Sequence, residues 1–349
     1  MEGKFHIISV NQDPDLSPRR HPGAARHLHS LRKAFRQLGA HVTEVDEGDA
    51  RRTQARLEKV HCSTPVSLIY ERHTPGRSTA AAFARANGVP YSIEINTPPA
   101  VGTECWRDQI EEEKIKRNDQ IIFGNASLIR AVSGPAADYA KAHGGRSDAI
   151  TVSPHGVDTS LFRAGIRGER RPFFRPPRNR FVLGFHGPNR PGDGFEMLVD
   201  VTRTLLARSY PVHLLVIGQG SFRALAKLPP CSYTRMACIG YEEMPACLSS
   251  VDAVPLTCSV PCASHHSPLN LIESMACGAV PVVPEVVDLP VQVKPGVNSQ
   301  VYPPGDSEAL IEKIVALLSN RDWCRELGRQ AATDARAYDW IGIAGMVLD

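Results

Sequence analysis

The chain has 349 residues, of which 42% are hydrophobic and 22% are charged, and its formal net charge is +3. This length exceeds what one hydrophobic core usually serves and predicts two α/β domains. So small a net charge, with arginines that are scattered rather than gathered in a stripe, excludes an electrostatic argument for nucleic-acid binding.

Apolar runs alternate with helical patterns along both halves of the chain, which predicts parallel sheets with helices on both faces. In the first half, strands are expected at 5–10, 41–45, 66–70, 90–95, 129–132 and 149–152. The clearest helices of this half are expected over 21–38, where Gly39 ends the helix, and over 104–125.

A tract at 162–179, with three prolines and six arginines, is the best candidate for a linker. After it, strands are expected at 180–185, 212–217, 236–239, 253–256 and 280–283. Helices near 306–319, 321–337 and 339–348 are expected to close the chain.

The most informative segment runs from Ser267 to Val283, and its pattern predicts a short helix, a stop at Gly278 and a buried strand. Ser267 can cap the helix, and Pro268 suits its first turn. A helix N-terminus attracts phosphate, and Glu273, about a turn and a half further on, could accept hydrogen bonds from a ribose. The segment therefore indicates a nucleoside-diphosphate site. The alternative is an ordinary helix–strand unit with a surface glutamate.

This segment resembles the donor-binding motif of retaining GT-B glycosyltransferases of the family 4 type, and Glu273 matches the second glutamate of that motif. Further similarity lies at 21–42, at 152–162 around His155, at 216–220 and at 239–244. The resemblance implies an α/β fold of GT-B architecture, in which two Rossmann-like domains face each other across a cleft. It places the acceptor in an N-terminal domain, 1–158, onto which helix 338–349 packs back. It places the nucleotide sugar in a C-terminal domain, 159–337.

The chain departs from the family pattern at three positions that bear on charge. His265 stands in place of the first glutamate, Pro188 replaces an arginine, and Asp193 replaces a lysine. The missing cations normally neutralise the leaving diphosphate. We expect Arg190 to supply that charge instead, since a guanidinium binds phosphate well, and His265 to orient the sugar.

The expected site residues follow from these matches and from polar side chains at strand ends. The catalytic residues are expected to be His265, Arg190 and Glu273. The donor is expected to contact Gly187, Asn189, Arg190, Gly218, Tyr241, Ser267, Leu269, Asn270 and Glu273. The acceptor is expected to contact Gly23, Arg72, Glu94 and Asn96. Glu71 and Glu94 have an alternative interpretation as ion-pair partners of Arg72.

We expect an enzyme that moves a sugar from a UDP- or GDP-sugar to a small-molecule acceptor, in specialised metabolism, with the retention that the resemblance implies. The nucleotide sugar is a co-substrate, and no other cofactor or metal is expected. The alternative is a degenerate sugar-nucleotide binder that regulates or partners an active transferase. Within the enzyme class, an acceptor at a membrane surface is the second possibility. The sequence also leaves open whether the protein forms a homodimer.

Three further classes are disfavoured by local sequence. The Gly-x-Gly at 218–220 lacks the third glycine and the acidic residue of a dehydrogenase. A zinc site at Cys258, Cys262, His265 and His266 would be cramped. No apolar run approaches the roughly 20 residues of a membrane span, and no secretory signal is seen. With nine irregularly spaced cysteines, this pattern predicts a cytoplasmic protein with reduced thiols.

Overall fold

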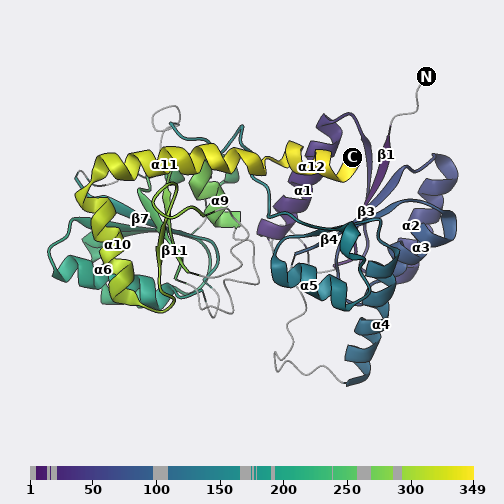
Figure 1. Cartoon of the computed structure of the whole chain (residues 1–349), viewed down its shortest axis with the longest axis horizontal. Helices are drawn as coiled ribbons and strands as arrows, with labels where there is room; N and C mark the ends of the chain where they lie inside the picture. The colour runs from purple at the N-terminus through teal and green to yellow at the C-terminus, as the bar shows by residue number, and fades with distance from the viewer. Residues whose placement is uncertain are drawn as a thin grey trace. The chain divides into compact units, whose positions relative to one another are not determined.

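The computed structural model describes residues 5–13, 16, 22–96, 109–165, 174, 177, 179–189, 193–237, 239–257, 269–285 and 293–349. These residues divide into two compact units. The first unit contains the described part of Met1–Gly156 together with Trp340–Asp349, and the second contains the described residues between Val157 and Asp339. Each unit is a six-stranded parallel sheet with helices on its faces, so the predicted fold class is confirmed (Figure 1).

The sheet of the first unit has the strand order β2-β1-β3-β4-β5-β6. Its strands are β1 His6–Asn11, β2 His41–Asp46, β3 Leu68–Arg72, β4 Tyr91–Ile95, β5 Leu128–Ala131 and β6 Ile150–Val152. Its helices are α1 Pro22–Gln37, α2 Ala50–Ser63, α3 Thr79–Asn87, α4 Gln109–Asn125, α5 Gly134–Ala142, a 3-10 turn Ser147–Ala149 and α12 Trp340–Leu348.

The C-terminal helix α12 belongs to the core of the first unit because its apolar face packs on α1. Leu31 and Phe35 of α1 are buried in one cluster with Trp340 and Ile343 of α12. A Cβ on Gly156 would lie 2.5 Å from the Trp340 ring, so the chain passes directly under that indole. Helix α12, at the end of the chain, therefore packs into the core of a unit whose sheet comes from the N-terminal half of the chain.

The sheet of the second unit has the order β12-β11-β10-β7-β8-β9. Its strands are β7 Phe181–His186, β8 Val212–Ile217, β9 Tyr233–Met236, β10 Ala253–Pro255, β11 Val280–Pro284 and β12 Gln300–Tyr302. Its α-helices are α6 Phe195–Ala207, α7 Met244–Leu248, α9 Leu269–Ala276, α10 Ser307–Ser319 and α11 Arg321–Ala335. Its 3-10 turns are Arg223–Lys227, Pro230–Ser232, Tyr241–Glu243 and Arg336–Tyr338.

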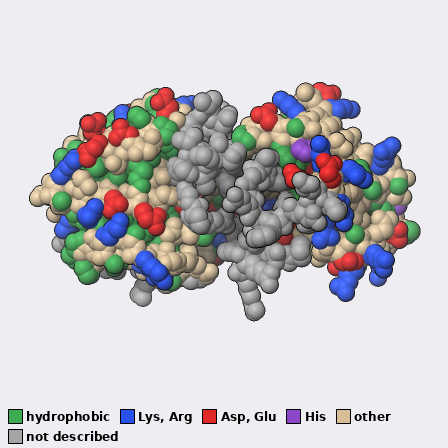
Figure 2. Space-filling model, turned by 90° about the horizontal axis from the view of Figure 1, so that it is seen from below, with side chains coloured by type: hydrophobic (Ala, Val, Ile, Leu, Met, Phe, Trp, Pro, Cys, Tyr) green, Lys and Arg blue, Asp and Glu red, His purple; other side chains and the backbone are tan. Residues whose placement is uncertain are grey.

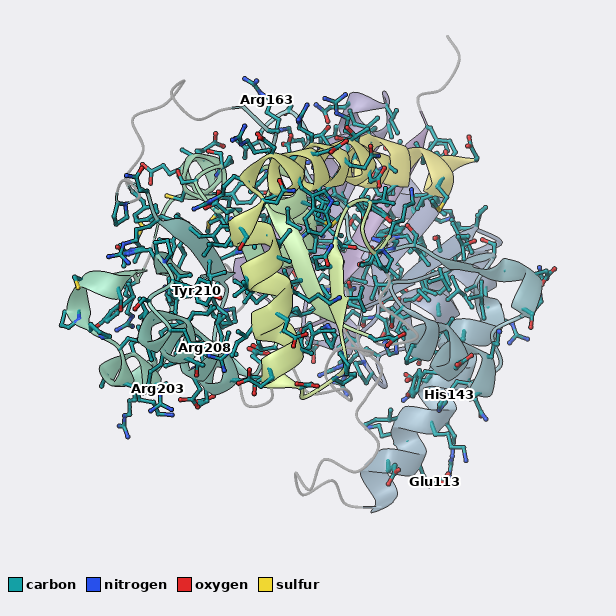
Figure 3. The ribbon with its side chains drawn as sticks, turned by 60° about the vertical axis from the view of Figure 1, so that its left-hand side comes forward. Glu113, His143, Arg163, Arg203, Arg208 and Tyr210 are labelled. Carbon is teal, nitrogen blue, oxygen red and sulfur yellow. The ribbon has the colours of Figure 1, made fainter. Side chains whose placement is uncertain are left out.

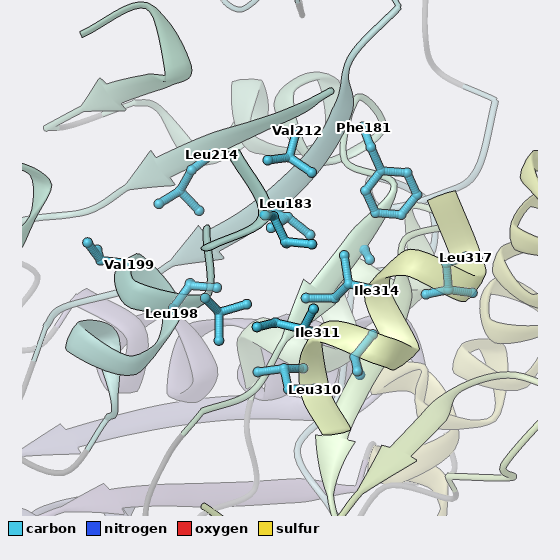
Figure 4. Packing of buried hydrophobic residues seen from close by; sticks show 14 of the residues in the cluster. Phe181, Leu183, Leu198, Val199, Val212, Leu214, Leu310, Ile311, Ile314 and Leu317 are labelled. Carbon is cyan, nitrogen blue, oxygen red and sulfur yellow. The ribbon is translucent and has the colours of Figure 1, made fainter. Parts of the chain in front are cut away.

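The core between this sheet and helices α6 and α10 consists of side chains that point from both layers toward each other (Figure 4). Leu183 and Leu214 come from the sheet, Leu198 comes from α6, and Ile314 comes from α10, and all four are fully buried. A strand that is covered on both faces needs a nearly continuous apolar run, which is why β7 and β8 were readable from sequence.

Two strands at the edges of this sheet differ from the sequence prediction. The strand expected at 236–239 lies three residues earlier, at Tyr233–Met236, and β12 was not predicted. Both are edge strands, with one neighbour each. An edge strand is only partly covered, so its sequence needs no strong apolar run. Of the linker expected at 162–179, only 162–165, 174, 177 and 179 are described, and Phe162 and Phe174 are buried in the core of the second unit.

The visible surface in Figure 2 carries acidic and basic side chains interspersed rather than in one patch of a single sign. Arg203 and Arg208, at α6 and just after it, illustrate this pattern (Figure 3). Arg203 Nη2 lies 3.3 Å from Asp200 Oδ1, and Arg208 Nη2 lies 2.9 Å from Glu308 Oε2. Exposed pairs of this kind contribute only about 0–1 kcal/mol each to stability.

The contact between α9 and α11 depends on two glycines. Gly278 ends α9 with a φ of +89°, and a Cβ on Gly328 of α11 would lie 2.2 Å from the Gly278 carbonyl oxygen. We expect Gly328→Ala to lower the free energy of unfolding by about 1–3 kcal/mol, because backbone must move apart. The matched control is Gly342→Ala in α12, where a Cβ meets nothing within 4 Å and alanine should add up to about 1 kcal/mol. Urea unfolding measures both, and equal effects would contradict this account.

Candidate functional site

The strand order of the second sheet reverses between β7 and β10, since β8 and β9 extend to one side and β11 and β12 to the other. In open parallel sheets, ligands bind beyond the carboxyl ends of the strands at such a switch point. Strand β7 ends there at His186, and Gly187 follows it. Helix α9 is the next described helix after β10. The switch point thus lies beside the segment that the sequence singled out.

Helix α9 turns an apolar face to the core and carries one buried carboxylate. Leu271, Ile272 and Met275 are buried in the core, and Glu273 is 6% exposed. The helix is joined to the end of β7 through Asn270, whose Nδ2 donates a hydrogen bond of 3.0 Å to the His186 carbonyl. Glu273 is therefore held at the switch point, and the interpretation as a surface glutamate is wrong.

The partner of Glu273 is a histidine that the sequence analysis did not single out. His186 Nε2 lies 3.2 Å from Glu273 Oε2, and the two side chains are 5% and 8% exposed. Within the residues that the structure describes, the other oxygen, Glu273 Oε1, takes part in no hydrogen bond. A polar residue at a strand end, the signal used for the first unit, was present at His186 and could have identified it.

Two glycines bring the loops after β7 and β8 into direct contact. A Cβ on Gly218 would lie 1.9 Å from the Gly187 carbonyl oxygen, and Gly187 itself has a φ of +126°. A Cβ on Gly187 would lie 3.8 Å from Asn270 Nδ2. Gly187, Gly218, Asn270 and Glu273, all expected to contact the donor, are thus gathered around His186. At Gly218 the missing side chain makes room for the Gly187 backbone, and the φ of Gly187 is one that glycine adopts without strain.

Other expected donor residues are placed less centrally. Asn189 Nδ2 donates a hydrogen bond of 2.7 Å to the Ser221 carbonyl. Tyr241 lies with its ring centre 5.0 Å from that of the buried Phe162. Leu269 is the first residue of α9. The expected residues Arg190, His265 and Ser267 lie outside the described residues.

The first sheet has its own switch point between β1 and β3. Arg72 ends β3 and pairs in register with Asn11, the last residue of β1. Its Nη1 lies 3.8 Å from Asp13 Oδ2, and its buried Nε has no hydrogen-bond partner among the residues that the structure describes. The expected acceptor residue Gly23 lies in the first turn of α1. The structure therefore places Arg72 where a ligand of this unit is expected.

Glu94 lies in a buried network with contacts to both of its oxygens. Oε1 lies 2.6 Å from His27 Nε2 and accepts a 2.7 Å hydrogen bond from Asn96 Nδ2. Oε2 accepts a 2.6 Å hydrogen bond from the Tyr70 hydroxyl and lies 2.8 Å from Arg130 Nη2. Burial would raise the pKa of Glu94, but Arg130 and then His27 outweigh burial and hold it well below its usual range. That Glu94 binds the acceptor stays a prediction. Its two oxygens are already engaged by these four contacts.

Glu71 is the second buried carboxylate of this edge and lacks such a cation. Its oxygens accept 2.5 Å hydrogen bonds from Gln12 Nε2 and from the Tyr91 hydroxyl. No ion pair joins Glu71 to a cation among the described residues. Burial raises the pKa of Glu71 to about 7, although the hydrogen bonds from Tyr91 and Gln12 oppose the shift. The alternative interpretation, in which Glu71 or Glu94 pairs with Arg72, is wrong, because among the described residues Arg72 forms its ion pair with Asp13.

The described residues include no group of three or more His, Cys, Asp or Glu side chains placed to hold a metal ion. The cysteine and histidine cluster considered in the sequence, at 258–266, lies outside the described residues. In the part of the chain that is described, no helix combines the length and hydrophobicity that crossing a bilayer requires.

Residues 180–320 match the family model described as glycosyl transferases group 1. The chain is also similar to curated proteins. It is 24% identical to a D-inositol 3-phosphate glycosyltransferase of Segniliparus rotundus, over 75% of this chain and 60% of that protein. It is 22% identical to a protein of the same name from an Arthrobacter species, over 89% of this chain and 74% of that protein. It is 26% identical to a phosphatidyl-myo-inositol mannosyltransferase of Mycobacterium leprae, over 58% of this chain and 53% of that protein.

Solved structures agree along nearly the whole chain. HepE from Anabaena, crystallised with UDP and glucose, superimposes with a TM-score of 0.71 at 17% identity, covering 99% of this chain and 98% of that one. Sucrose-phosphate synthase from Thermosynechococcus elongatus superimposes with a TM-score of 0.73 at 16% identity, covering 99% and 97%. At such low identity the likeness concerns the fold.

Proposed function

The chain has the GT-B fold and carries a glycosyl transferase group 1 domain over residues 180–320, and from this premise we propose that it transfers a sugar from a nucleoside-diphosphate sugar to a small acceptor. The observation that carries the proposal is the buried Glu273, held at the β7–β10 switch point among glycines. In this proposal Glu273 accepts hydrogen bonds from the ribose, and the first turn of α9 binds the diphosphate.

The proposed reaction breaks the bond between the anomeric carbon and the diphosphate oxygen and forms one to an acceptor oxygen. The acceptor proton passes to the departing diphosphate, so the proposal needs no separate protein base. Retention of anomeric configuration is part of the proposal, by resemblance to family 4. Negative charge grows on the leaving group, and we assign its stabilisation to Arg190 and the orientation of the sugar to His265.

For the acceptor we propose a small polyhydroxylated molecule. Curated relatives carry the name D-inositol 3-phosphate glycosyltransferase. Arg72, with a buried Nε that lacks a hydrogen-bond partner in the described part of the chain, suits an anionic group on such a molecule. Asn96, whose Nδ2 is engaged by Glu94, can offer its carbonyl oxygen to a hydroxyl. A place in specialised metabolism is the setting that we propose.

The second candidate is a sugar-nucleotide binder without turnover. It is favoured by Pro188 and Asp193, which stand where family members carry an arginine and a lysine. Such a protein would keep the nucleotide site and lose the cations that stabilise the leaving group. Binding alone does not separate the two candidates, whereas release of nucleotide from a sugar donor does.

Binding at Glu273 is tested by calorimetric titration of UDP and GDP into the wild-type chain and Glu273→Ala. We expect one nucleotide to bind and the variant to bind it about 10- to 100-fold more weakly, because hydrogen bonds to a charged group contribute about 1.5–3 kcal/mol. Glu308→Ala is the control, since that carboxylate is exposed and pairs with Arg208. An unchanged dissociation constant in Glu273→Ala would contradict the assignment.

A further inference from the structure

His186 is held by one face of α9 through three separate contacts. Its carbonyl accepts a 3.0 Å hydrogen bond from Asn270 Nδ2, its Nε2 lies 3.2 Å from Glu273 Oε2, and its Nδ1 lies 3.5 Å from Ser274 Oγ. These partners occupy positions i, i+3 and i+4 of the helix and therefore share one face. The end of β7 and the first turns of α9 are thus fixed to each other through this residue.

The contacts favour the ring tautomer that carries its proton on Nε2. An ionised carboxylate only accepts hydrogen bonds, so Nε2 must be the donor to Glu273. Ser274 Oγ already donates a 2.9 Å hydrogen bond to the Asn270 carbonyl, which leaves the longer contact to Nδ1 as the weaker one. The contact from Nε2 to Oε2 is also the one hydrogen bond of the Glu273 carboxylate among the described residues.

We infer that His186 is a positioning residue for Glu273: it engages Oε2 and thereby turns Oε1 toward the ribose hydroxyls of the nucleotide. The inference rests on the proposed function. Both oxygens of Glu94 are engaged by its four contacts, whereas Glu273 has one hydrogen-bond partner, His186, among the described residues. His186 lies at the switch point itself, where the nucleotide is proposed to bind.

The test compares variants of His186 with ribose and dideoxyribose nucleotides. His186→Phe removes the donor and keeps a ring, while His186→Gln keeps an N–H group that can reach Glu273. UDP and GDP, and their 2′,3′-dideoxy forms, are titrated calorimetrically into each protein. We expect His186→Phe to weaken binding of the ribose nucleotide by about 10- to 100-fold and to leave the dideoxy nucleotide within about 2-fold. We expect His186→Gln to recover most of the loss.

A matched control is His213→Gln in the neighbouring strand β8. His213 is also buried, and its Nε2 bonds to Thr234 Oγ1 at 2.9 Å, but it pairs in register with Val182, four residues before His186. We expect it to leave nucleotide affinity unchanged. If His186→Phe does not fold, His186→Asn, whose amide is too short to reach Glu273, replaces it with the same expected result.

The outcomes distinguish a failure of the positioning role of His186 from a failure of the proposed function. A wild-type chain that binds neither UDP nor GDP overturns both. A chain that binds one of them, with His186→Phe unchanged or weakened equally for ribose and dideoxyribose forms, overturns the positioning role alone. In the double variant His186→Phe/Glu273→Ala, affinity should equal that of Glu273→Ala, and a further tenfold loss would also overturn the role.

Discussion

Glu94→Gln is expected to lower the free energy of unfolding by about 3–5 kcal/mol, because it leaves the charge of Arg130 buried without its counterion. Arg130 is fully buried, with Nη2 2.8 Å from Glu94 Oε2. Its Nη1 donates to the carbonyls of Ser153 and Pro154, which cannot replace a carboxylate charge. Urea unfolding followed by circular dichroism measures the loss.

The control for this prediction is Glu58→Gln on the exposed face of α2. Glu58 accepts a 2.7 Å hydrogen bond from Gln54 at the surface, and its loss should change the free energy of unfolding by less than about 0.5 kcal/mol. A loss below about 1 kcal/mol in Glu94→Gln would show that Arg130 finds other compensation, and the network would not have the role that we assign to it.

Glu71→Gln is expected to change the pH dependence of stability in a defined direction. The pKa of Glu71 is raised by burial from 4.5 to about 7 in the folded protein. Between these values the folded chain binds a proton that the unfolded chain has lost, so stability falls as pH rises through this window. The shift corresponds to about 3 kcal/mol in total. Above about pH 7 this contribution no longer changes.

The measurement for Glu71 is urea unfolding of both proteins at pH 5, 6, 7 and 8. Relative to the wild type, Glu71→Gln should become more stable by about 2.5 kcal/mol between the two ends of this series, because glutamine cannot ionise. The Glu58→Gln control should run parallel to the wild type. Parallel curves for Glu71→Gln as well would mean that water or a cation stabilises the Glu71 carboxylate in the folded state.

The sequence predicted the elements whose stability depends on burial and left others unspecified. Strands β7 and β8 were found because buried strands need continuous apolar runs, and the end of α9 was found because Gly278 has a left-handed backbone. Strand β9 was misplaced because an edge strand needs no such run. The GT-B fold was predicted from a motif rather than from these patterns.

The contacts within the sites depend on register, which one sequence does not display. Arg130 lies opposite Glu94 only because β4 pairs with β5 in that register. Glu71 and Arg72 are neighbours in sequence but point to opposite faces of β3, so the ion pair of the alternative interpretation does not form. The position of His186 at a strand end is visible in the sequence, but nothing in the sequence shows that the end of β7 lies against α9, so its pairing with Glu273 was missed. The sequence identified the chemical groups, and the fold determined their partners.

The most direct measurement of the central claim is nucleotide release from a panel of UDP- and GDP-sugars by the wild-type chain and Glu273→Ala. We predict that the wild type releases nucleotide from one donor, faster when its acceptor is present, and that Glu273→Ala loses at least about tenfold in kcat/KM. A wild-type chain that binds a nucleotide and releases none from any donor would contradict the claim and leave a binding protein in its place.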